Sequence, residues 1–287
     1  MKRTASPLPL VGLGLIAALI GMLPWLVDSA HLHLPLQNLS TLTPEQQPIA
    51  LLPINQYYLG EIAAILIVGF AIAALCARGC ASTRRATGWT FLGTFLVTVI
   101  ALVQSFLATQ RTLESGRTST LYLTFMMVAL AACYIVAIVA FLLLTAANAA
   151  ARIIGSAVAL TFLTQWFESL AGSVTSLASF PHAHMVWLYL PYALLGWVIG
   201  WSHLRTRGVQ LSAAASIILL VVGRAFLVAI TFAAGTRAHY GDRAAILADI
   251  RLAFVNAIAT TEILYGLGAA IVCMGLGFMI RGLRQRS

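Results

Sequence analysis

Apolar residues run along this chain in long stretches, separated by short segments that hold most of the charged residues. A helix that crosses about 30 Å of hydrocarbon needs about 20 apolar residues. Eight stretches reach this length, and each predicts a membrane-spanning helix. The predicted spans are 8–28, 57–77, 88–109, 120–147, 153–177, 185–204, 209–233 and 252–280. The pattern therefore predicts an all-α, polytopic integral membrane protein, organised as a single transmembrane domain over residues 1–287.

The composition excludes a water-soluble protein. Hydrophobic residues make up 61% of the 287 residues and charged residues only 9%, which is too little charge to cover a surface in water. The net charge of +9 would suggest a nucleic-acid partner in a soluble protein, but here the basic residues lie between apolar stretches. We therefore predict a lipid bilayer as the surroundings and no nucleic-acid partner. Because arginine far outnumbers lysine, as in proteins of GC-rich bacteria, the predicted location is a bacterial cytoplasmic (inner) membrane.

The basic residues also predict the orientation. With both termini in the cytoplasm, eleven basic side chains lie on the cytoplasmic side and five on the outer side, in agreement with the positive-inside rule. The inner set is Lys2, Arg3, Arg78, Arg84, Arg85, Arg152, Arg205, Arg207, Arg281, Arg284 and Arg286, and the outer set is Arg111, Arg117, Arg237, Arg243 and Arg251.

The connections between spans predict two surface helices and no soluble domain. The longest connection, residues 29–57, contains Thr43, Pro44 and Glu45, which are typical of a helix start. A second short helix is predicted over residues 242–254, leading into the last span. The inner connections are too short for a nucleotide-binding domain and contain no phosphate-binding loop. Any ATP hydrolysis would therefore come from a partner ATPase.

The order of the spans permits a duplication of four plus four helices, because the first and fifth spans begin on the same side. Two features match between the halves: a histidine pair follows each of these spans, and VQSFLA at 103–108 can be laid over GRAFLV at 223–228. This alignment places Gln104 opposite Arg224.

Arg224 is the only charged residue between Gly208 and Thr236. An arginine in hydrocarbon costs about 3 kcal/mol, so it requires a partner. At about 1.5 Å per residue, Arg224, Glu168 and Glu262 lie about 14 to 15 Å below the predicted outer ends of their spans. We expect Arg224 to pair with Glu168, Glu262 or both, and Gln104 to add a polar group nearer the outer end of its span.

Two interpretations of this polar core remain open. In the first interpretation, the ion pair only fixes which helices pack together, and no cargo is involved. Alternatively, one of the two carboxylates binds a ligand or exchanges protons for cargo, as in proton-coupled carriers. The spacing of Glu168 and Glu262 does not require a catalytic role.

Four histidines predict a possible metal site just outside the membrane. Histidine is the commonest metal ligand, and two His-x-His pairs that meet in space would suit Zn or Cu. The residues are His31 and His33 after the first span and His182 and His184 after the fifth. The alternative is that these side chains are interfacial and bind no metal.

Small residues indicate where helices pack closely. Gly196 and Gly200 form a GxxxG pattern in the sixth predicted span, where Pro191 is expected to kink the helix. The eighth predicted span carries four glycines that also favour close packing: Gly266, Gly268, Gly275 and Gly277. The cysteines lie in spans or at inner ends, so no disulfide framework is predicted.

Three functions are compatible with these features. The best supported is a membrane permease, or the membrane subunit of a transport system, with Glu168, Arg224 and Glu262 as its polar core. The first alternative is a non-catalytic scaffold subunit that holds a partner in a larger membrane complex. The second is a metal-dependent membrane enzyme that acts on a lipid-linked substrate at the outer face, using the histidines. Of the three functions, an enzyme is the least supported by these features.

Overall fold

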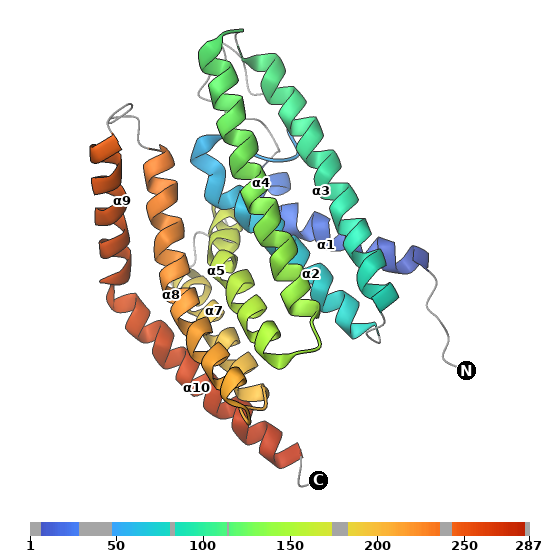
Figure 1. The fold of residues 1–287 in the computed structure, drawn as a ribbon, viewed down its shortest axis with the longest axis vertical. Helices are drawn as coiled ribbons and strands as arrows, with labels where there is room; N and C mark the ends of the chain where they lie inside the picture. Colours follow the sequence, from blue (N-terminus) through green and yellow to red (C-terminus); the bar gives the residue numbers. More distant parts are fainter. Residues whose placement is uncertain are drawn as a thin grey trace. The chain divides into compact units, whose positions relative to one another are not determined.

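The computed structural model describes residues 7–28, 48–80, 84–113, 115–173, 183–235 and 243–284. These residues form an all-α fold with nine α-helices and a 3-10 turn, η3 (Gln56–Tyr58) (Figure 1). The helices are α1 (Pro7–Val27), α2 (Leu59–Gly79), α3 (Arg84–Thr112), α4 (Arg117–Thr145), α5 (Ala149–Ser173), α7 (Ala183–Trp201), α8 (Arg207–Gly235), α9 (Arg243–Ile258) and α10 (Thr261–Arg284). The surface helix predicted near Thr43 lies outside the described residues.

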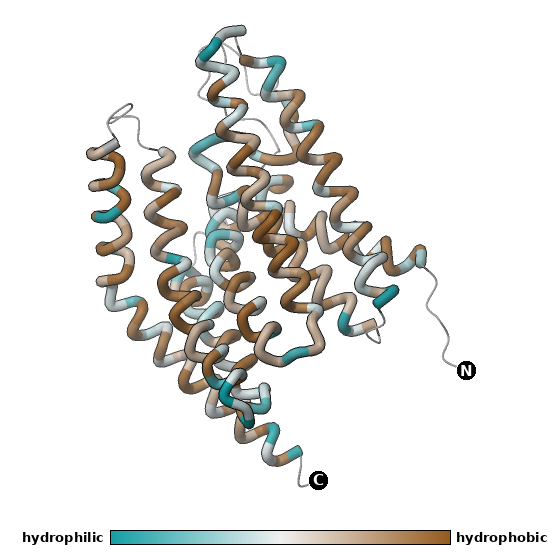
Figure 2. Tube along the Cα trace, viewed as in Figure 1, coloured by the Kyte–Doolittle hydropathy of each residue, from teal (hydrophilic) through white to brown (hydrophobic). Residues whose placement is uncertain are grey.

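Seven of the described helices are long and apolar enough to cross a membrane, so the chain is a multi-pass membrane protein. They are α1, η3 with α2 (Gln56–Gly79), α3, α4, α5, α8 and α10. Figure 2 shows apolar residues along most of their length and hydrophilic residues mainly near their ends. The sixth predicted span coincides with α7, a helix of 19 residues that includes Pro191, but α7 is not among the seven.

The eighth predicted span differs from the structure. The sequence pattern predicts one continuous helix over residues 252–280, but the structure ends α9 at Ile258 and begins α10 at Thr261. Glu262 therefore lies in the first turn of α10 and not ten residues inside a continuous helix. The short helix predicted over residues 242–254 is present as the first part of α9.

The chain divides into two compact units. Unit 1 holds α1, α2, α3, α4 as far as Phe141, and residues 169–173 at the end of α5. Unit 2 holds the remainder of α4 and α5 together with α7, α8, α9 and α10.

In unit 1, α1 packs closely against α2 and α3. A Cβ atom on Gly14 would lie 2.1 Å from the carbonyl oxygen of Thr90, and one on Gly21 would lie 2.6 Å from that of Ile65, so the backbones are in direct contact. The Thr94 hydroxyl donates a hydrogen bond of 3.0 Å to the Gly14 carbonyl across the same crossing. Small residues that allow this approach replace the hydrophobic driving force that helices lack in lipid.

Aromatic rings join α2, α3 and α4 within unit 1. Phe70 of α2 contacts Phe91, Tyr134 and Phe141, with ring centroids 5.8 to 6.3 Å apart. Phe91 also contacts Phe141 directly at 5.2 Å. Edge-to-face pairs of this kind add about 0.5–1.5 kcal/mol each beyond burial, so they tie α4 to the other helices.

A non-helical segment, residues 48–55, lies in unit 1, and it is mostly buried from Ala50 onward. Ala50, Leu52 and Ile54 are completely buried, and the backbone polar groups of the segment bond to side chains on neighbouring helices. The Trp25 Nε1 group donates to the Ala50 carbonyl at 2.7 Å, and the Leu52 N–H donates to the Ser105 hydroxyl at 2.7 Å. Irregular backbone within a membrane protein requires such partners, because lipid supplies none.

Replacing Ser105 with alanine is expected to destabilise unit 1 by about 1–3 kcal/mol, because the buried Leu52 N–H loses its acceptor. The free energy of unfolding, measured by SDS titration in mixed micelles, checks this value. Thr124→Ala is the control, because the exposed Thr124 hydroxyl donates only to Thr120 of its own helix. Equal small losses in both variants would contradict a structural role of the Ser105 hydroxyl.

In unit 2, α7 and α10 pack side by side and run in the same direction. Gly196 lies against Ala270, and Gly200 lies against Met274, so both residue numbers rise together along the contact. At the carboxyl end of α7, Arg281 donates to the carbonyl of Gly200 at 3.3 Å and also to that of Ser202. α9 lies beside α8, and Figure 1 shows the chain bending where α9 gives way to α10.

Candidate functional site

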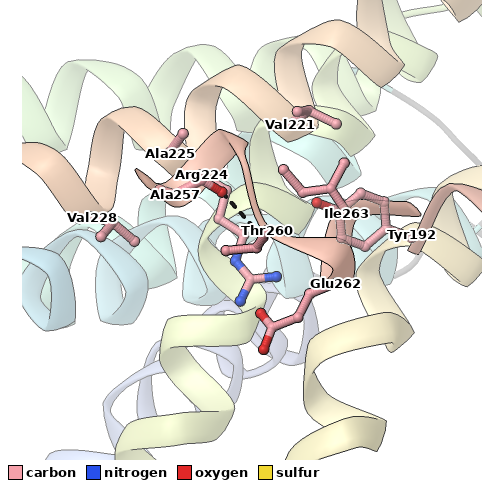
Figure 3. A pocket seen from close by; sticks show the side chains of 9 residues that line it. All are labelled: Tyr192, Val221, Arg224, Ala225, Val228, Ala257, Thr260, Glu262 and Ile263. Carbon is pink, nitrogen blue, oxygen red and sulfur yellow. Dashed lines mark hydrogen bonds between the residues drawn. The ribbon is translucent and has the colours of Figure 1, made fainter. Parts of the chain in front are cut away.

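A small cavity of about 180 Å³ lies within unit 2, among α7, α8 and the junction between α9 and α10. Figure 3 shows the side chains that line it. Most of the lining is apolar, and Arg224 and Glu262 are its charged members. The lining residues are Tyr192, Val221, Arg224, Ala225, Val228, Ala257, Thr260, Glu262 and Ile263.

The break between α9 and α10 forms one wall of the cavity. At the end of α9, the Ala259 N–H donates to the Val255 carbonyl at 2.9 Å. At the start of α10, the Ile263 N–H donates to the Thr260 carbonyl at 3.3 Å. The Thr260 hydroxyl donates to the Ala257 carbonyl at 3.3 Å. The carboxyl end of one helix and the amino end of the next therefore meet beside the cavity.

The two helix ends stabilise the charges that lie beside them. Glu262 is in the first turn of α10, where the helix dipole favours a negative charge. Arg224 lines the cavity together with Ala257 and Thr260 at the end of α9, where the dipole favours a positive charge. Each effect contributes about 0.3–1 kcal/mol, and more in partly buried sites. The break thus offsets part of the cost of placing Arg224 in an apolar helix.

The three residues predicted to form a polar core all lie in unit 2. The side chains of Arg224 and Glu262 point toward each other in Figure 3. Glu168, half-buried in α5, lies within electrostatic range of Arg224, His184 and Glu262. When all three are ionised, the arginine and the two glutamates have a net charge of −1.

Tyr192 is a site residue that the sequence pattern did not single out. Its side chain is only 2% exposed, and its ring packs on Gly266, where a Cβ atom would lie 2.8 Å from the ring. The hydroxyl makes no hydrogen bond of ordinary geometry, although Arg224 is close enough to act on it electrostatically. A tyrosine inside an apolar helix, next to Pro191, was the available signal.

Gln104 lies in unit 1 and forms hydrogen bonds with the backbone of the non-helical segment, residues 48–55. Its amide nitrogen donates to the Ile49 carbonyl at 2.8 Å, and its amide oxygen accepts from the Leu51 N–H at 3.0 Å. These bonds hold non-helical backbone in place. A role of Gln104 in ligand binding remains a prediction.

Of the four histidines predicted to bind metal, His31, His33 and His182 lie outside the described residues. His184 is exposed, at the second position of α7. In the described ranges, no three histidine, cysteine or carboxylate side chains gather closely enough to hold a metal ion. A zinc or copper site at the histidines therefore remains a prediction. All four cysteines are free thiols.

Family models, curated proteins and solved structures contain no match to this chain, so the chemistry of the site is argued from its geometry alone.

Replacing Tyr192 with phenylalanine is expected to leave the stability of unit 2 unchanged or to raise it by up to about 1 kcal/mol, because it removes a buried hydroxyl without a hydrogen bond. Unfolding in mixed micelles measures the change. Tyr134 provides a matched comparison in unit 1, because its buried hydroxyl also makes no hydrogen bond of ordinary geometry. A loss above about 1.5 kcal/mol in Tyr192→Phe alone would show that the hydroxyl supports the fold, which would contradict a hydroxyl kept for a ligand.

Proposed function

We propose that this chain is a membrane permease, or the membrane subunit of a transport system, whose cargo passes through the cavity of unit 2. The proposed location is a bacterial cytoplasmic membrane with both termini in the cytoplasm. In this arrangement α7 is an eighth crossing, because its 19 residues extend about 28 Å at 1.5 Å per residue.

The observation that carries the proposal is the meeting of charge, cavity and helix break at one place. Transporters commonly build substrate sites from interrupted membrane helices, because the exposed helix ends supply partial charges where lipid would tolerate none. A purely structural ion pair needs neither an adjoining cavity nor an unsatisfied tyrosine hydroxyl. Both are present beside Arg224.

The proposed energy source is either a partner ATPase or a proton gradient. The inner connections among the described helices are short, such as residues 146–148 between α4 and α5. They cannot hold a nucleotide-binding domain. ATP-driven transport would therefore require a partner ATPase, and proton-driven transport would use Glu168 or Glu262 as the exchanging carboxylate.

The test compares cells that lack the protein with cells that carry the wild type, Arg224→Gln or Arg251→Gln, the last being an exposed arginine on α9 outside the cavity. Polar metabolites inside the cells are quantified by mass spectrometry. The wild type and Arg251→Gln are expected to restore the level of at least one metabolite, while Arg224→Gln behaves like the deletion. Unchanged metabolites in the deletion strain, or a fully active Arg224→Gln variant, would contradict transport through this cavity.

A further inference from the structure

We propose that the cavity of unit 2 binds a small zwitterion, a molecule with an ammonium group and a carboxylate on neighbouring carbons. This inference rests on the proposed transport function and names its class of cargo. Arg224 is assigned to the carboxylate and Glu262 to the ammonium group.

The charges of the site favour a zwitterion over a simple ion. A lone anion at Arg224 would lie close to two carboxylates, Glu168 and Glu262, and would be repelled by both. A lone cation at Glu262 would lie close to the guanidinium that points toward the same carboxylate (Figure 3). A zwitterion satisfies both groups and leaves the net charge of the cluster unchanged, so binding requires no change of protonation.

The helix break supports the two charged side chains assigned to the ligand. The amino end of α10 favours the carboxylate of Glu262, and the carboxyl end of α9 favours the guanidinium of Arg224. Both ends lie at the cavity, through Glu262 and Ile263 on one side and Ala257 on the other. The ligand's two charges are therefore met by these side chains, as charge-assisted contacts.

Tyr192 provides an independent indication that the cavity takes a polar ligand. Its side chain lines the cavity, and its buried hydroxyl makes no hydrogen bond of ordinary geometry, although Arg224 lies beside it. A buried hydroxyl in this state is destabilising until a well-placed partner arrives. Either charged group of a zwitterion supplies that partner.

The volume of the cavity limits the size of the ligand. Sites for drug-sized molecules commonly hold about 300–1,000 Å³, and this cavity holds about 180 Å³. Its remaining walls are the aliphatic side chains of Val221, Val228 and Ile263 and the methyl groups of alanines. A compact molecule of the size of a small amino acid fits this lining.

The test measures equilibrium binding to the full chain in lipid nanodiscs, with glycine as the zwitterion and with acetate and methylammonium as probes that carry only one charge each. Glycine is expected to bind saturably, and acetate and methylammonium about 10- to 100-fold more weakly, because each lacks one charge-assisted contact. Arg224→Gln and Glu262→Gln are each expected to weaken glycine binding by a similar factor. Tyr192→Phe, which keeps the ring, is expected to weaken it by about 5- to 10-fold.

Controls separate binding from folding. Arg251→Gln and Asp249→Asn change the same kinds of charge on α9 outside the cavity, and both are expected to bind glycine like the wild type. All variants are compared only where they elute as single peaks with wild-type helicity. If the charge variants fail this requirement, Tyr192→Phe and the comparison of the three probes still test the proposal.

The outcomes also separate the ligand class from transport. Acetate binding as well as glycine would make this an anion site, and methylammonium binding as well as glycine would make it a cation site; either overturns the zwitterion. If no probe binds but Arg224→Gln still abolishes the metabolite change in cells, the ligand class is wrong and transport stands. If neither is observed, both proposals fail.

Discussion

Replacing Gly196 with alanine is expected to destabilise unit 2 by about 3 kcal/mol. A Cβ atom at Gly196 would lie 2.1 Å from the Ala270 carbonyl oxygen, and the atoms that must move are backbone on both helices. The same approach recurs one turn later, where a Cβ atom on Gly200 would lie 2.2 Å from the Met274 carbonyl. Separating α7 from α10 also moves Tyr192 relative to Glu262, so ligand binding is expected to be lost with stability.

The matched control is Gly268→Ala on α10, because a Cβ atom there has no other atom within 4 Å. Alanine favours a helix over glycine by about 1 kcal/mol, so this variant is expected to be neutral or more stable. The free energy of unfolding of the two variants is compared in mixed micelles. Glycine binding in nanodiscs measures whether the cavity still binds the ligand. Equal effects of Gly196→Ala and Gly268→Ala on stability would show that α7 and α10 do not pack as described.

Reversing the charge of Arg224 is expected to destabilise unit 2 by about 3–5 kcal/mol, because Arg224→Glu would place three carboxylates within electrostatic range of one another. Glu168→Arg alone is expected to have an effect of similar sign, since it places two cations together. The double variant Glu168→Arg with Arg224→Glu restores one cation beside two anions. We expect it to recover about 1–3 kcal/mol relative to the sum of the single variants.

The control for this cycle pairs Glu168→Arg with Arg251→Glu, because Arg251 is exposed on α9 and does not line the cavity. These two changes are expected to add within about 0.5 kcal/mol. Unfolding free energies of the wild type and the five variants in mixed micelles provide the measurement. A Glu168/Arg224 double variant that is no more stable than the sum of its single changes would contradict direct coupling between these side chains.

The membrane helices could be predicted from the sequence because length and hydrophobicity decide them almost alone. The end of α9 could not, because residues 258–260 are Ile-Ala-Thr, without the proline or glycine that usually marks a break. The interruption is stabilised by its neighbours. The exposed helix ends at this point interact favourably with the charges of Arg224 and Glu262 beside the cavity. A hydropathy pattern contains no information about such neighbours.

The glycines of α10 show which part of the helix packing could be predicted from helical periodicity. At 100° per residue, Gly266 and Gly277 lie within about 20° of each other, while Gly268 and Gly275 lie about 160–180° away on the opposite side. The structure places the first pair against Tyr192 and Gly200 and leaves the second pair open. Periodicity could therefore separate two faces, but only tertiary packing identifies which face meets α7.

The polar core could be predicted because a charge in an apolar helix is costly and requires a partner. This argument selects Arg224, Glu168 and Glu262, whose role as a functional core remains a prediction, and the depth assigned to Glu262 assumed a continuous helix. Tyr192 was missed because a single tyrosine next to Pro191 in an apolar helix is a weak signal, and its burial and the poor hydrogen-bond geometry of its hydroxyl depend on tertiary packing.

The most direct test of the central claim asks whether the cavity beside Arg224 holds water. Val228 and Val222 are both on α8 and similarly exposed, at 48% and 40%, but only Val228 lines the cavity. Each is replaced by cysteine in a chain whose 4 native cysteines have been changed to alanine, and a charged, membrane-impermeant thiol reagent is applied to membranes. We predict that Val228→Cys is modified and that Val222→Cys, which faces lipid, is not. Failure to modify Val228→Cys would show a dry, purely structural charge cluster, and equal modification of both cysteines would show that the cavity does not set access to this helix.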